Sequence, residues 1–446
     1  MSGANADTIV AVATPPGTGG VGIVRLSGSQ AAAICEAVAG RLPPPRRACY
    51  RAFREFDGRI MDRGIILFFP APASFTGEDV VEFQGHGGYV VLDMLVERCV
   101  EEGARLARPG EFSERAFLNG RMDLVQAEAV ADLIESSTRD AARLAMKSVE
   151  GEFSARIAEC AESMLSIRAF VEAAIDFPDE EIDFLSESDI AGRLDHAIDL
   201  VDRTRKECHR GAVVRNGLEV VLCGAPNAGK SSLMNALARK QRAIVSAQPG
   251  TTRDLVDERV QVGGVVLNLV DTAGLREVAD DIEREGISRA RAAIDRCDLA
   301  LLVCDDREDA AETEALLASL PADVPRLVVR NKIDLSGRAP GRDEAGRLCV
   351  SAATGAGIEC LERTLLERSR RGGEQDTRFL ARRRHLDALD RGAAHLADAH
   401  REFVAGNGEL MAESLRMAHL ALGEITGEVT SDDLLGHIFG SFCIGK

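Results

Sequence analysis

Residues 224–231 form the pattern of a phosphate-binding loop. The sequence Gly-Ala-Pro-Asn-Ala-Gly-Lys-Ser follows an apolar run and precedes a segment with helical spacing. Its glycines allow backbone N–H groups to face phosphate oxygens beside the positive end of a helix. Lys230 would reach the β and γ phosphates, and the Ser231 hydroxyl would ligate Mg²⁺. These residues predict a site for a nucleoside triphosphate.

Three later motifs favour guanine as the base. Residues 271–274 read Asp-Thr-Ala-Gly, where Asp271 would hold the magnesium shell through water and the Gly274 N–H would sense the γ phosphate. Residues 331–334 read Asn-Lys-Ile-Asp. The Asp334 carboxylate can accept hydrogen bonds from both N1–H and the exocyclic amine of guanine, a pair of donors that adenine does not offer. Residues 351–352, Ser-Ala, would contact the base edge from the next strand end.

A GTP site also needs a loop that brings a threonine to magnesium. Residues 250–254 read Gly-Thr-Thr-Arg-Asp and lie between the first two motifs, so Thr252 is assigned to this role. Ser231 and Thr252 are therefore the expected Mg²⁺ ligands. The residues that these motifs predict to bind GTP are Asn227, Ala228, Gly229, Lys230, Ser231, Ser232, Thr252, Asp271, Thr272, Ala273, Gly274, Asn331, Lys332, Asp334, Ser351 and Ala352.

One position departs from the Ras-type pattern of GTP hydrolysis. Leu275 stands where a Ras-like enzyme has the glutamine that orients the attacking water. Leucine has no polar group, so another side chain must position that water. The acidic residues of the following segment are the candidates, and they are Glu277, Asp280, Asp281 and Glu283.

Short apolar runs alternate with amphipathic segments around these motifs, which indicates a doubly wound parallel sheet. Helical spacing dominates residues 122–210 and returns after residue 373. We therefore expect a P-loop GTPase domain inserted into a helical domain. The runs expected to be its strands are residues 218–223, 265–270, 299–304, 327–329 and 348–350.

The first 120 residues mix β-branched runs with glycine and proline, which is typical of a compact α+β unit. The predicted fold class is thus multidomain, α/β plus all-α. The expected parts are an α+β N-terminal domain, a first helical segment, the GTPase domain and a second helical segment, at residues 1–120, 121–213, 214–376 and 377–446.

Composition narrows the class of protein. At 446 residues the chain exceeds one domain of roughly 150 residues, and 45% hydrophobic with 28% charged residues excludes a wholly disordered protein. The sequence has no apolar run of about 18 residues and no signal-peptide pattern, so we expect a cytoplasmic protein without membrane contact. Eleven cysteines without a Cys-x-x-Cys pair favour neither disulfides nor zinc. The net charge of -18 restricts any nucleic-acid contact to a local patch.

Further motifs run from one end of the chain to the other and are more specific than a P-loop. Examples are Gln-Gly-His-Gly-Gly at residues 84–88 and Phe-Cys-Ile-Gly-Lys at residues 442–446. With the GTPase motifs, they resemble the MnmE (TrmE) family of tRNA modification GTPases over the whole length. The other stretches that carry the resemblance are residues 7–16, 77–79, 109–112, 115–120 and 174–181.

The resemblance implies a function and partners. The N-terminal domain would bind 5-formyltetrahydrofolate or a related folate and form a homodimer. The chain would join the flavoprotein MnmG in a heterotetramer and act on tRNA. Together they would add an aminomethyl or carboxymethylaminomethyl group to C5 of the wobble uridine of certain tRNAs, with GTP hydrolysis regulating the complex.

The resemblance also implies roles for single residues. Glu283 matches the glutamate that orients the hydrolytic water. K⁺ would bind Asn227, helped by Ser246, Gln248 and Thr251, and Ser246 and Thr251 would also contact GTP. Folate contacts fall on Arg25, Glu82, Arg121 and Lys446, although at Arg121 the family pattern has lysine.

Cys443 and the basic run at residues 382–385 each have two possible interpretations. Cys443 lies in Cys-Ile-Gly-Lys, which does not fit a prenylation signal; it is either a small buried thiol or a residue needed near the modification chemistry. The basic run Arg-Arg-Arg-His at residues 382–385 is either a tRNA phosphate contact or a solvated helix face.

Two other functions remain as alternatives. A ribosome-assembly GTPase shares the GTPase motifs, but it would be expected to carry a basic RNA-binding appendage that this acidic chain lacks. A stand-alone folate-dependent methyltransferase with a regulatory GTPase domain would modify its substrate without MnmG. Modification activity measured with and without MnmG separates this second alternative from the MnmE family.

Overall fold

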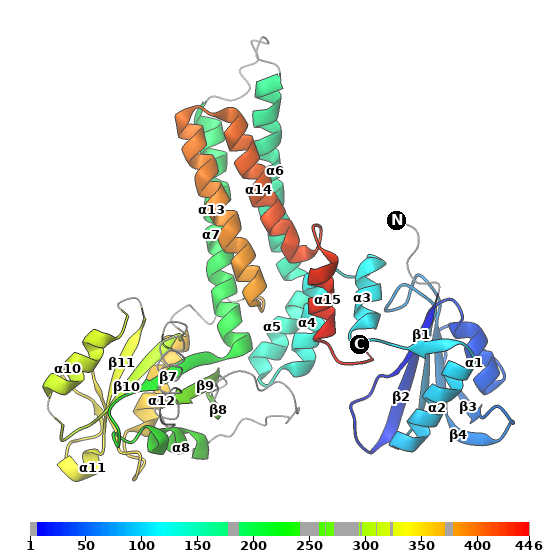
Figure 1. The fold of residues 1–446 in the computed structure, drawn as a ribbon, viewed down its shortest axis with the longest axis horizontal. Coiled ribbons are helices and arrows are strands. Elements are labelled where there is room, and N and C mark those ends of the chain that lie inside the picture. The colour runs from blue at the N-terminus through cyan, green and yellow to red at the C-terminus, as the bar shows by residue number, and fades with distance from the viewer. Residues whose placement is uncertain are drawn as a thin grey trace, which may run out of the picture. The chain divides into compact units, whose positions relative to one another are not determined.

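The computed structural model describes residues 7–176, 187–240, 258–263, 265–271, 294, 297–308, 310–321, 324–370 and 378–445 (Figure 1). The chain divides into two compact units. Unit 1 comprises residues 1–131, 149–168 and 415–446, and unit 2 comprises residues 132–148 and 169–414. Each unit contains its own β-sheet.

Unit 1 contains a six-stranded sheet with the order β3-β4-β5-β2-β1-β6. All neighbouring strands are antiparallel except β1 and β6, which are parallel. The predicted α+β fold of this region is confirmed. The strands are β1 (Thr8–Val12), β2 (Gly19–Ser27), β3 (Cys49–Arg54), β4 (Ile60–Phe69), β5 (Val80–Gly87) and β6 (Ala104–Leu106).

Helices cover one face of this sheet because alternate strand residues are apolar. Val24 and Leu26 point into a core with residues of α1 (Ala31–Ala39) and α2 (Tyr89–Glu101). Arg25, between them, therefore points to the opposite face. On that face Ile9, Ala11 and Ala107 pack with Phe112 of α3 (Glu111–Leu118).

The carboxyl-terminal helix α15 (Asp432–Gly440) also belongs to unit 1. Its residues Ile438 and Phe439 are buried with Leu124 and Ala127 from the start of α4 (Leu124–Glu135). The Ser431 hydroxyl accepts a hydrogen bond from the Leu434 N–H at 3.3 Å and caps the helix. This packing fixes the direction in which the chain leaves α15.

Unit 2 contains a seven-stranded sheet with the order β12-β13-β11-β10-β7-β9-β8. The five inner strands are parallel, and β8 and β12 are antiparallel edges. The predicted doubly wound sheet is confirmed, with two edge strands that the pattern does not predict. The strands are β7 (Leu218–Cys223), β8 (Glu258–Val262), β9 (Val265–Asp271), β10 (Leu299–Asp305), β11 (Arg326–Asn331), β12 (Gly341–Arg342) and β13 (Leu348–Cys349).

Helices lie on both faces of this sheet. Residues of α8 (Lys230–Lys240) and α12 (Ile358–Arg370) bury one apolar cluster with the strands. A second cluster on the other face includes Leu320, which follows α10 (Ala310–Ser319). The short helix α11 (Ile333–Ser336) follows β11 directly. In sheets of this kind, ligands bind outside the carboxyl ends of the parallel strands.

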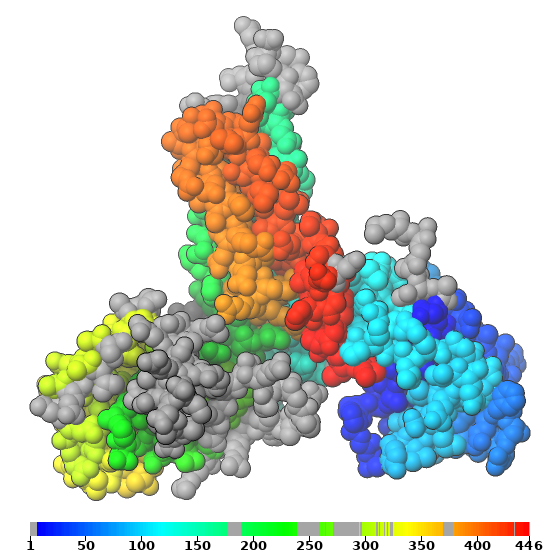
Figure 2. Space-filling model, in the orientation of Figure 1, coloured from blue at the N-terminus to red at the C-terminus, as the bar shows by residue number. Residues whose placement is uncertain are grey.

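Long helices complete the chain, as the all-α part of the prediction requires. They are α5 (Arg139–Val149), α6 (Glu152–Asp176), α7 (Glu187–Asn216), α13 (Arg383–Ala405) and α14 (Gly408–Thr426). Figure 2 shows the side chains of α13 (orange) lying directly against those of α7 (green). Within the described residues, no helix has the length and apolar character needed to cross a membrane.

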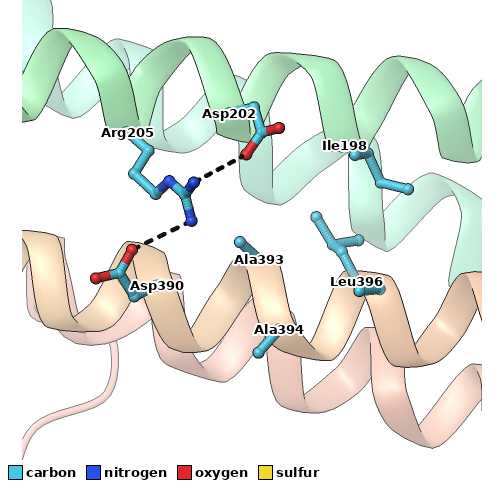
Figure 3. A pocket seen from close by; sticks show the side chains of 8 residues that line it. Ile198, Asp202, Arg205, Asp390, Ala393, Ala394 and Leu396 are labelled. Carbon is cyan, nitrogen blue, oxygen red and sulfur yellow. Dashed lines mark hydrogen bonds and ion pairs between the residues drawn. The ribbon is translucent and has the colours of Figure 1, made fainter. Parts of the chain in front are cut away.

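A shallow cavity of about 320 Å³ lies between α7 and α13 (Figure 3). Arg205 spans it, because its guanidinium lies 3.9 Å from Asp202 on its own helix and 3.4 Å from Asp390 on α13. Ala393 and Leu396 line its apolar side. All three charged groups are partly exposed, so this contact fixes the relative positions of the two helices only weakly.

The basic run at residues 382–385 does not form a continuous solvated face. Arg382 donates to Asp132 at 2.7 Å, and the buried His385 accepts a hydrogen bond from the Arg382 N–H at 3.1 Å. Asp132 also accepts a hydrogen bond from Arg215 at 2.9 Å. Arg382 and His385 therefore hold the start of α13, whereas Arg383 is exposed, and a tRNA contact of this run stays a prediction.

The eleven cysteines are free thiols, and eight of them are buried. Burial raises the pKa of Cys35 to about 12, and it also raises the pKa of Cys99. Such thiols are poor nucleophiles at neutral pH because the thiolate is the reactive form. Cys443 is among the three that are partly exposed.

Candidate functional site

The phosphate-binding loop connects β7 to α8 in unit 2. The Lys230 side chain is 5% exposed, and its Nζ donates to the carbonyl oxygens of Gly224 at 2.9 Å and Ala225 at 3.0 Å. Its ammonium therefore lies within the curve of the loop. Gly229 has a φ of +95°, and a Cβ there would collide with the Asn331 amide. Only glycine fits this position.

Asn331 joins three parts of the site. Its Nδ2 donates to the carbonyl of Ala228 at 3.0 Å, and its Oδ1 accepts a hydrogen bond from the Ala352 N–H at 3.0 Å. The residue is 1% exposed and ends β11. One side chain thus ties the phosphate-binding loop to the segment expected to contact the base.

The guanine-recognition residues are also held in place. The buried Ser351 hydroxyl donates to Oδ1 of Asp334 at 2.5 Å, which orients that carboxylate. Lys332 has a φ of +66°, and its Nζ lies 3.0 Å from Asp305. Hydrogen bonds from Arg307 and then from Lys332 hold the pKa of Asp305 well below its usual range. Asp305 therefore stays ionised and anchors Lys332.

Asp305 is a site residue that the motifs do not predict. A signal was nevertheless present, because Asp305 directly follows the apolar run 299–304. Ligands of open α/β sheets bind beyond the carboxyl ends of the strands, so a polar residue there is a candidate. Asp305 acts on the site through its ion pair with Lys332.

Other predicted residues also lie in this region. Asn227 is exposed with a φ of +67°, and Ser231 and Ser232 lie in the first turn of α8, at the positive end of the helix where anions bind. Asp271 ends β9, and its side chain is not described. The predicted residues that lie outside the described part of the chain are Ser246, Gln248, Thr251, Thr252, Thr272, Ala273, Gly274, Glu283 and Lys446.

A second candidate site is a cavity of about 280 Å³ in unit 1. The adjacent residues Arg25 on β2 and Glu82 on β5 form an ion pair across it at 2.9 Å. The structure thus brings together three of the four predicted folate contacts. The cavity is lined by Arg25, Arg46, Phe69, Ala73, Ser74, Phe75, Val80, Glu82 and Arg121.

The carboxyl-terminal tail reaches the same site. The Arg25 guanidinium lies 3.5 Å from the carbonyl oxygen of Gly445. Gly445 has a φ of +96°, and a Cβ there would collide with the carbonyl of Val12. The Cys443 carbonyl accepts a hydrogen bond from the Gly110 N–H at 3.4 Å. Cys443 is therefore held near this cavity through its backbone.

The residues of this cavity fit a folate. Glu82 can accept hydrogen bonds from the N–H groups of a pterin ring, and the rings of Phe69 and Phe75 supply apolar walls. Arg121 keeps the positive charge that a lysine would carry. No sequence motif predicts Phe69, Phe75 and Arg46, because the end of β4 and two loops bring them together.

A buried charge network supports the loop beside the cavity. Glu111 is completely buried and accepts hydrogen bonds from Arg105, from the Arg108 N–H and from Arg115. Burial alone would raise the pKa of Glu111, but these donors outweigh it and lower the pKa to about 2. Arg115 also donates to Glu78 at 3.1 Å, which holds the loop before β5.

Comparison with known proteins shows the family of the chain. A family model of the GTP-binding protein TrmE N-terminus matches residues 8–121, and a model of the MnmE helical domain matches residues 124–443. The chain is 52% identical over 450 residues to the tRNA modification GTPase MnmE of Methylococcus capsulatus, covering 100% of both chains. The chain belongs to the MnmE family.

A second relative and a solved structure are also similar to this chain. The tRNA modification GTPase MnmE of Yersinia pseudotuberculosis is 52% identical and covers 99% of both chains. Among solved structures, the G domain of the T. maritima FeoB iron transporter is 27% identical, covers 34% of this chain and 98% of that domain, and has a TM-score of 0.26.

Proposed function

We propose that this chain hydrolyses GTP and acts in tRNA modification. The observation that carries the proposal is the Asn331 side chain, which joins the phosphate-binding loop to the guanine-recognition segment. The names of its full-length MnmE relatives support tRNA modification as the process. A ribosome-assembly GTPase would not be expected to share the N-terminal and helical parts.

For the hydrolysis step, we propose that residues of the chain hold GTP and orient water. Lys230 contacts the β and γ phosphates, while Asp334 accepts the two guanine donors. Glu283 orients the attacking water in place of the glutamine that Leu275 replaces. Mg²⁺ held by Ser231 and Thr252, and K⁺ held by Asn227, Ser246, Gln248 and Thr251, supply positive charge to the transferring phosphoryl group.

For the tRNA chemistry, we propose that the cavity in unit 1 binds 5-formyltetrahydrofolate or a related folate through Arg25, Glu82, Arg121 and Lys446. The contact of Arg25 with Gly445 supports this, since it brings the tail that carries Cys443 to the cavity. The proposed assembly is a homodimer that joins MnmG in a heterotetramer. The proposed product is a wobble uridine with an aminomethyl or carboxymethylaminomethyl group at C5.

Mass spectrometry of wobble uridines tests the proposed process. Cells that lack this chain should lose the C5 group, and the wild-type chain should restore it. Asp334→Asn should fail to restore it and should shift nucleotide preference from guanine to xanthine, because the carboxamide presents an N–H donor to guanine N1–H. The control Glu344→Gln removes an exposed charge from the same sheet region and should behave as wild type. Unchanged uridines in cells without the chain would contradict the proposal.

The catalytic assignment has a separate test. Glu283→Ala should keep GTP binding but lose hydrolysis by about 30- to 1000-fold, as expected when one water-orienting contact is removed. Glu285→Ala is the nearby control. If Glu283→Ala hydrolyses GTP at the wild-type rate, Glu283 does not orient the water, and Glu277, Asp280 and Asp281 become the candidates.

A further inference from the structure

The side chains that line the cavity in unit 1 carry more positive than negative charge. Three guanidinium groups and one carboxylate line it, and Arg25 is paired with Glu82. Among the described residues, no carboxylate lies within ion-pair distance of Arg46 or Arg121. The cavity therefore presents two cations that are available to an anionic ligand.

Arg46 is held in place although it has no acidic partner. Its guanidinium lies over the Phe69 ring, 5.5 Å from the ring centroid, and donates to the carbonyl of Ala73. Its backbone N–H donates to the carbonyl of Phe68 at 2.8 Å. These contacts fix the side chain before a ligand arrives, which reduces the entropy lost on binding.

The backbone of Arg46 is also unusual. Its φ is +59°, a left-handed conformation that costs a non-glycine residue on the order of 1 kcal/mol. In the described part of the chain, the other non-glycine residues with positive φ are Asn227 and Lys332. Both lie in the nucleotide site. A strained backbone that the fold retains at Arg46 is consistent with a ligand-binding role there.

The strand register places Arg46 at one end of the cavity. Leu67 of β4 pairs with Glu82, whereas Phe69 pairs with Val80. Phe69, over whose ring the Arg46 guanidinium lies, is thus one strand away from Glu82 and two residues, or about 7 Å, further along the strand direction. A pterin ring bound by Glu82 would direct the rest of a folate along the cavity, and the far end of every folate is a glutamate with two carboxylates.

We propose that Arg46 binds a carboxylate of the folate glutamyl tail and makes the cavity select folates by the charge of that tail. This inference rests on the proposed folate-binding function. A guanidinium suits the role because it can donate two parallel hydrogen bonds to one carboxylate.

Binding calorimetry on the full-length protein tests the inference with two ligands of the same shape. One is 5-formyltetrahydrofolate, and the other is its diamide, in which both tail carboxylates are uncharged carboxamides. The wild-type protein should bind the acid about 10-fold more tightly, as one ordered charge pair permits. Arg46→Gln should lose that preference and bind the diamide as the wild type does. Arg46→Lys should keep part of the preference.

Arg47→Gln is the matched control, because Arg47 is the exposed neighbour of Arg46 and does not line the cavity. It should bind both ligands as the wild type does. Equal wild-type affinity for acid and diamide would overturn the role of Arg46 while leaving folate binding intact. If Arg46→Gln loses affinity for both ligands equally, the role is also overturned, since that outcome indicates a structural role. Failure of the wild type to bind either ligand would overturn the folate function itself.

Discussion

Glu111 shows how a single residue carries a buried charge in this protein. Its carboxylate is enclosed by α3 and the residues around it, yet Arg105 and Arg115 both donate to it. Arg115 also reaches Asp7 at 2.9 Å. A buried carboxylate is tolerated only when it is paired and hydrogen-bonded. The network therefore depends on Glu111 being ionised.

The lowered pKa of Glu111 predicts a pH dependence of stability. Because the folded-state pKa of about 2 lies below the ordinary value of 4.5, its contribution is complete above pH 4.5 and is lost as the pH falls towards 2. That contribution is about 3 kcal/mol. The difference in unfolding free energy between wild type and Glu111→Gln, measured by urea unfolding, should shrink over this pH range. A constant difference from pH 6 to pH 2.5 would contradict the network.

Asn227 gives a second prediction for a single residue. Its left-handed backbone presents an exposed side chain at the phosphate-binding loop, where the proposed K⁺ would bind. GTP hydrolysis should therefore be at least about 10-fold faster in potassium than in sodium at equal ionic strength. A 10-fold change in rate corresponds to about 1.4 kcal/mol of activation free energy. Asn227→Ala should abolish the difference, whereas Asn235→Ala on α8 should not. Equal wild-type rates in both salts would exclude potassium as the activating ion.

Asp132, in the last turns of α4, connects the ends of two helices of unit 2. Arg215 lies in the last turn of α7, immediately before β7, and Arg382 precedes α13. Both arginines donate to Asp132, which is 7% exposed. The chain thus enters and leaves the sheet region through segments that one carboxylate holds. This element-level contact is stronger than that of Arg205 because its groups are less exposed.

Removal of the Asp132 carboxylate should therefore destabilise unit 2. Asp132→Asn removes the negative charge that two partly buried guanidinium groups share, at a cost of about 1–3 kcal/mol. Asp390→Asn removes the exposed partner of Arg205 and should cost less than about 1 kcal/mol. Calorimetric unfolding of both variants measures the contrast. Equal costs would show that burial does not decide the strength of these pairs.

The strands that carry the nucleotide site can be predicted from the sequence, whereas the edge strands cannot. Residues 218–223 are apolar except for the exposed Glu219, because β7 is covered on both faces, and the strand has those bounds. β3 and β8 lie at sheet edges and contain charged residues, so their apolar signal is weak. The sequence of residues 382–385 does not show that Arg382 is held by a tertiary contact, because its partner Asp132 lies far away in the sequence.

The two candidate sites also differ in how well the sequence predicts them. The nucleotide site is built from short motifs that each follow one strand, so the sequence alone predicts their chemistry. The cavity in unit 1 combines β2, β5 and loops around Arg46, Phe75 and Arg121. Its residues can be assigned from family resemblance, but Arg46 belongs to no motif and becomes a candidate only when the fold brings it to the cavity.

The GTPase part of the chain has a core of its own. One apolar cluster of buried residues in unit 2 is formed by residues between Leu218 and Leu365, and the cluster on the other sheet face lies between Val221 and Val324. Among the described residues, the buried members of both clusters all lie within residues 218–365, and the partly buried Val213 of α7 packs against the first cluster. Domain boundaries at residues 214 and 376 remain predictions, but cores closed within this range are what an inserted domain requires.

Residues 215–375 expressed alone should therefore fold and bind GDP. Binding to the folded state adds about 2.7 kcal/mol of stability when GDP is present at 100 times its dissociation constant. Thermal unfolding should show one cooperative transition that GDP raises and ADP leaves unchanged, because Asp334 accepts donors that adenine does not have. Asp334→Asn in the same fragment is the control: it should unfold cooperatively but gain little from GDP. A fragment without a cooperative transition in saturating GDP would show that the flanking helices are needed for this core, and equal stabilisation by ADP would remove the guanine assignment.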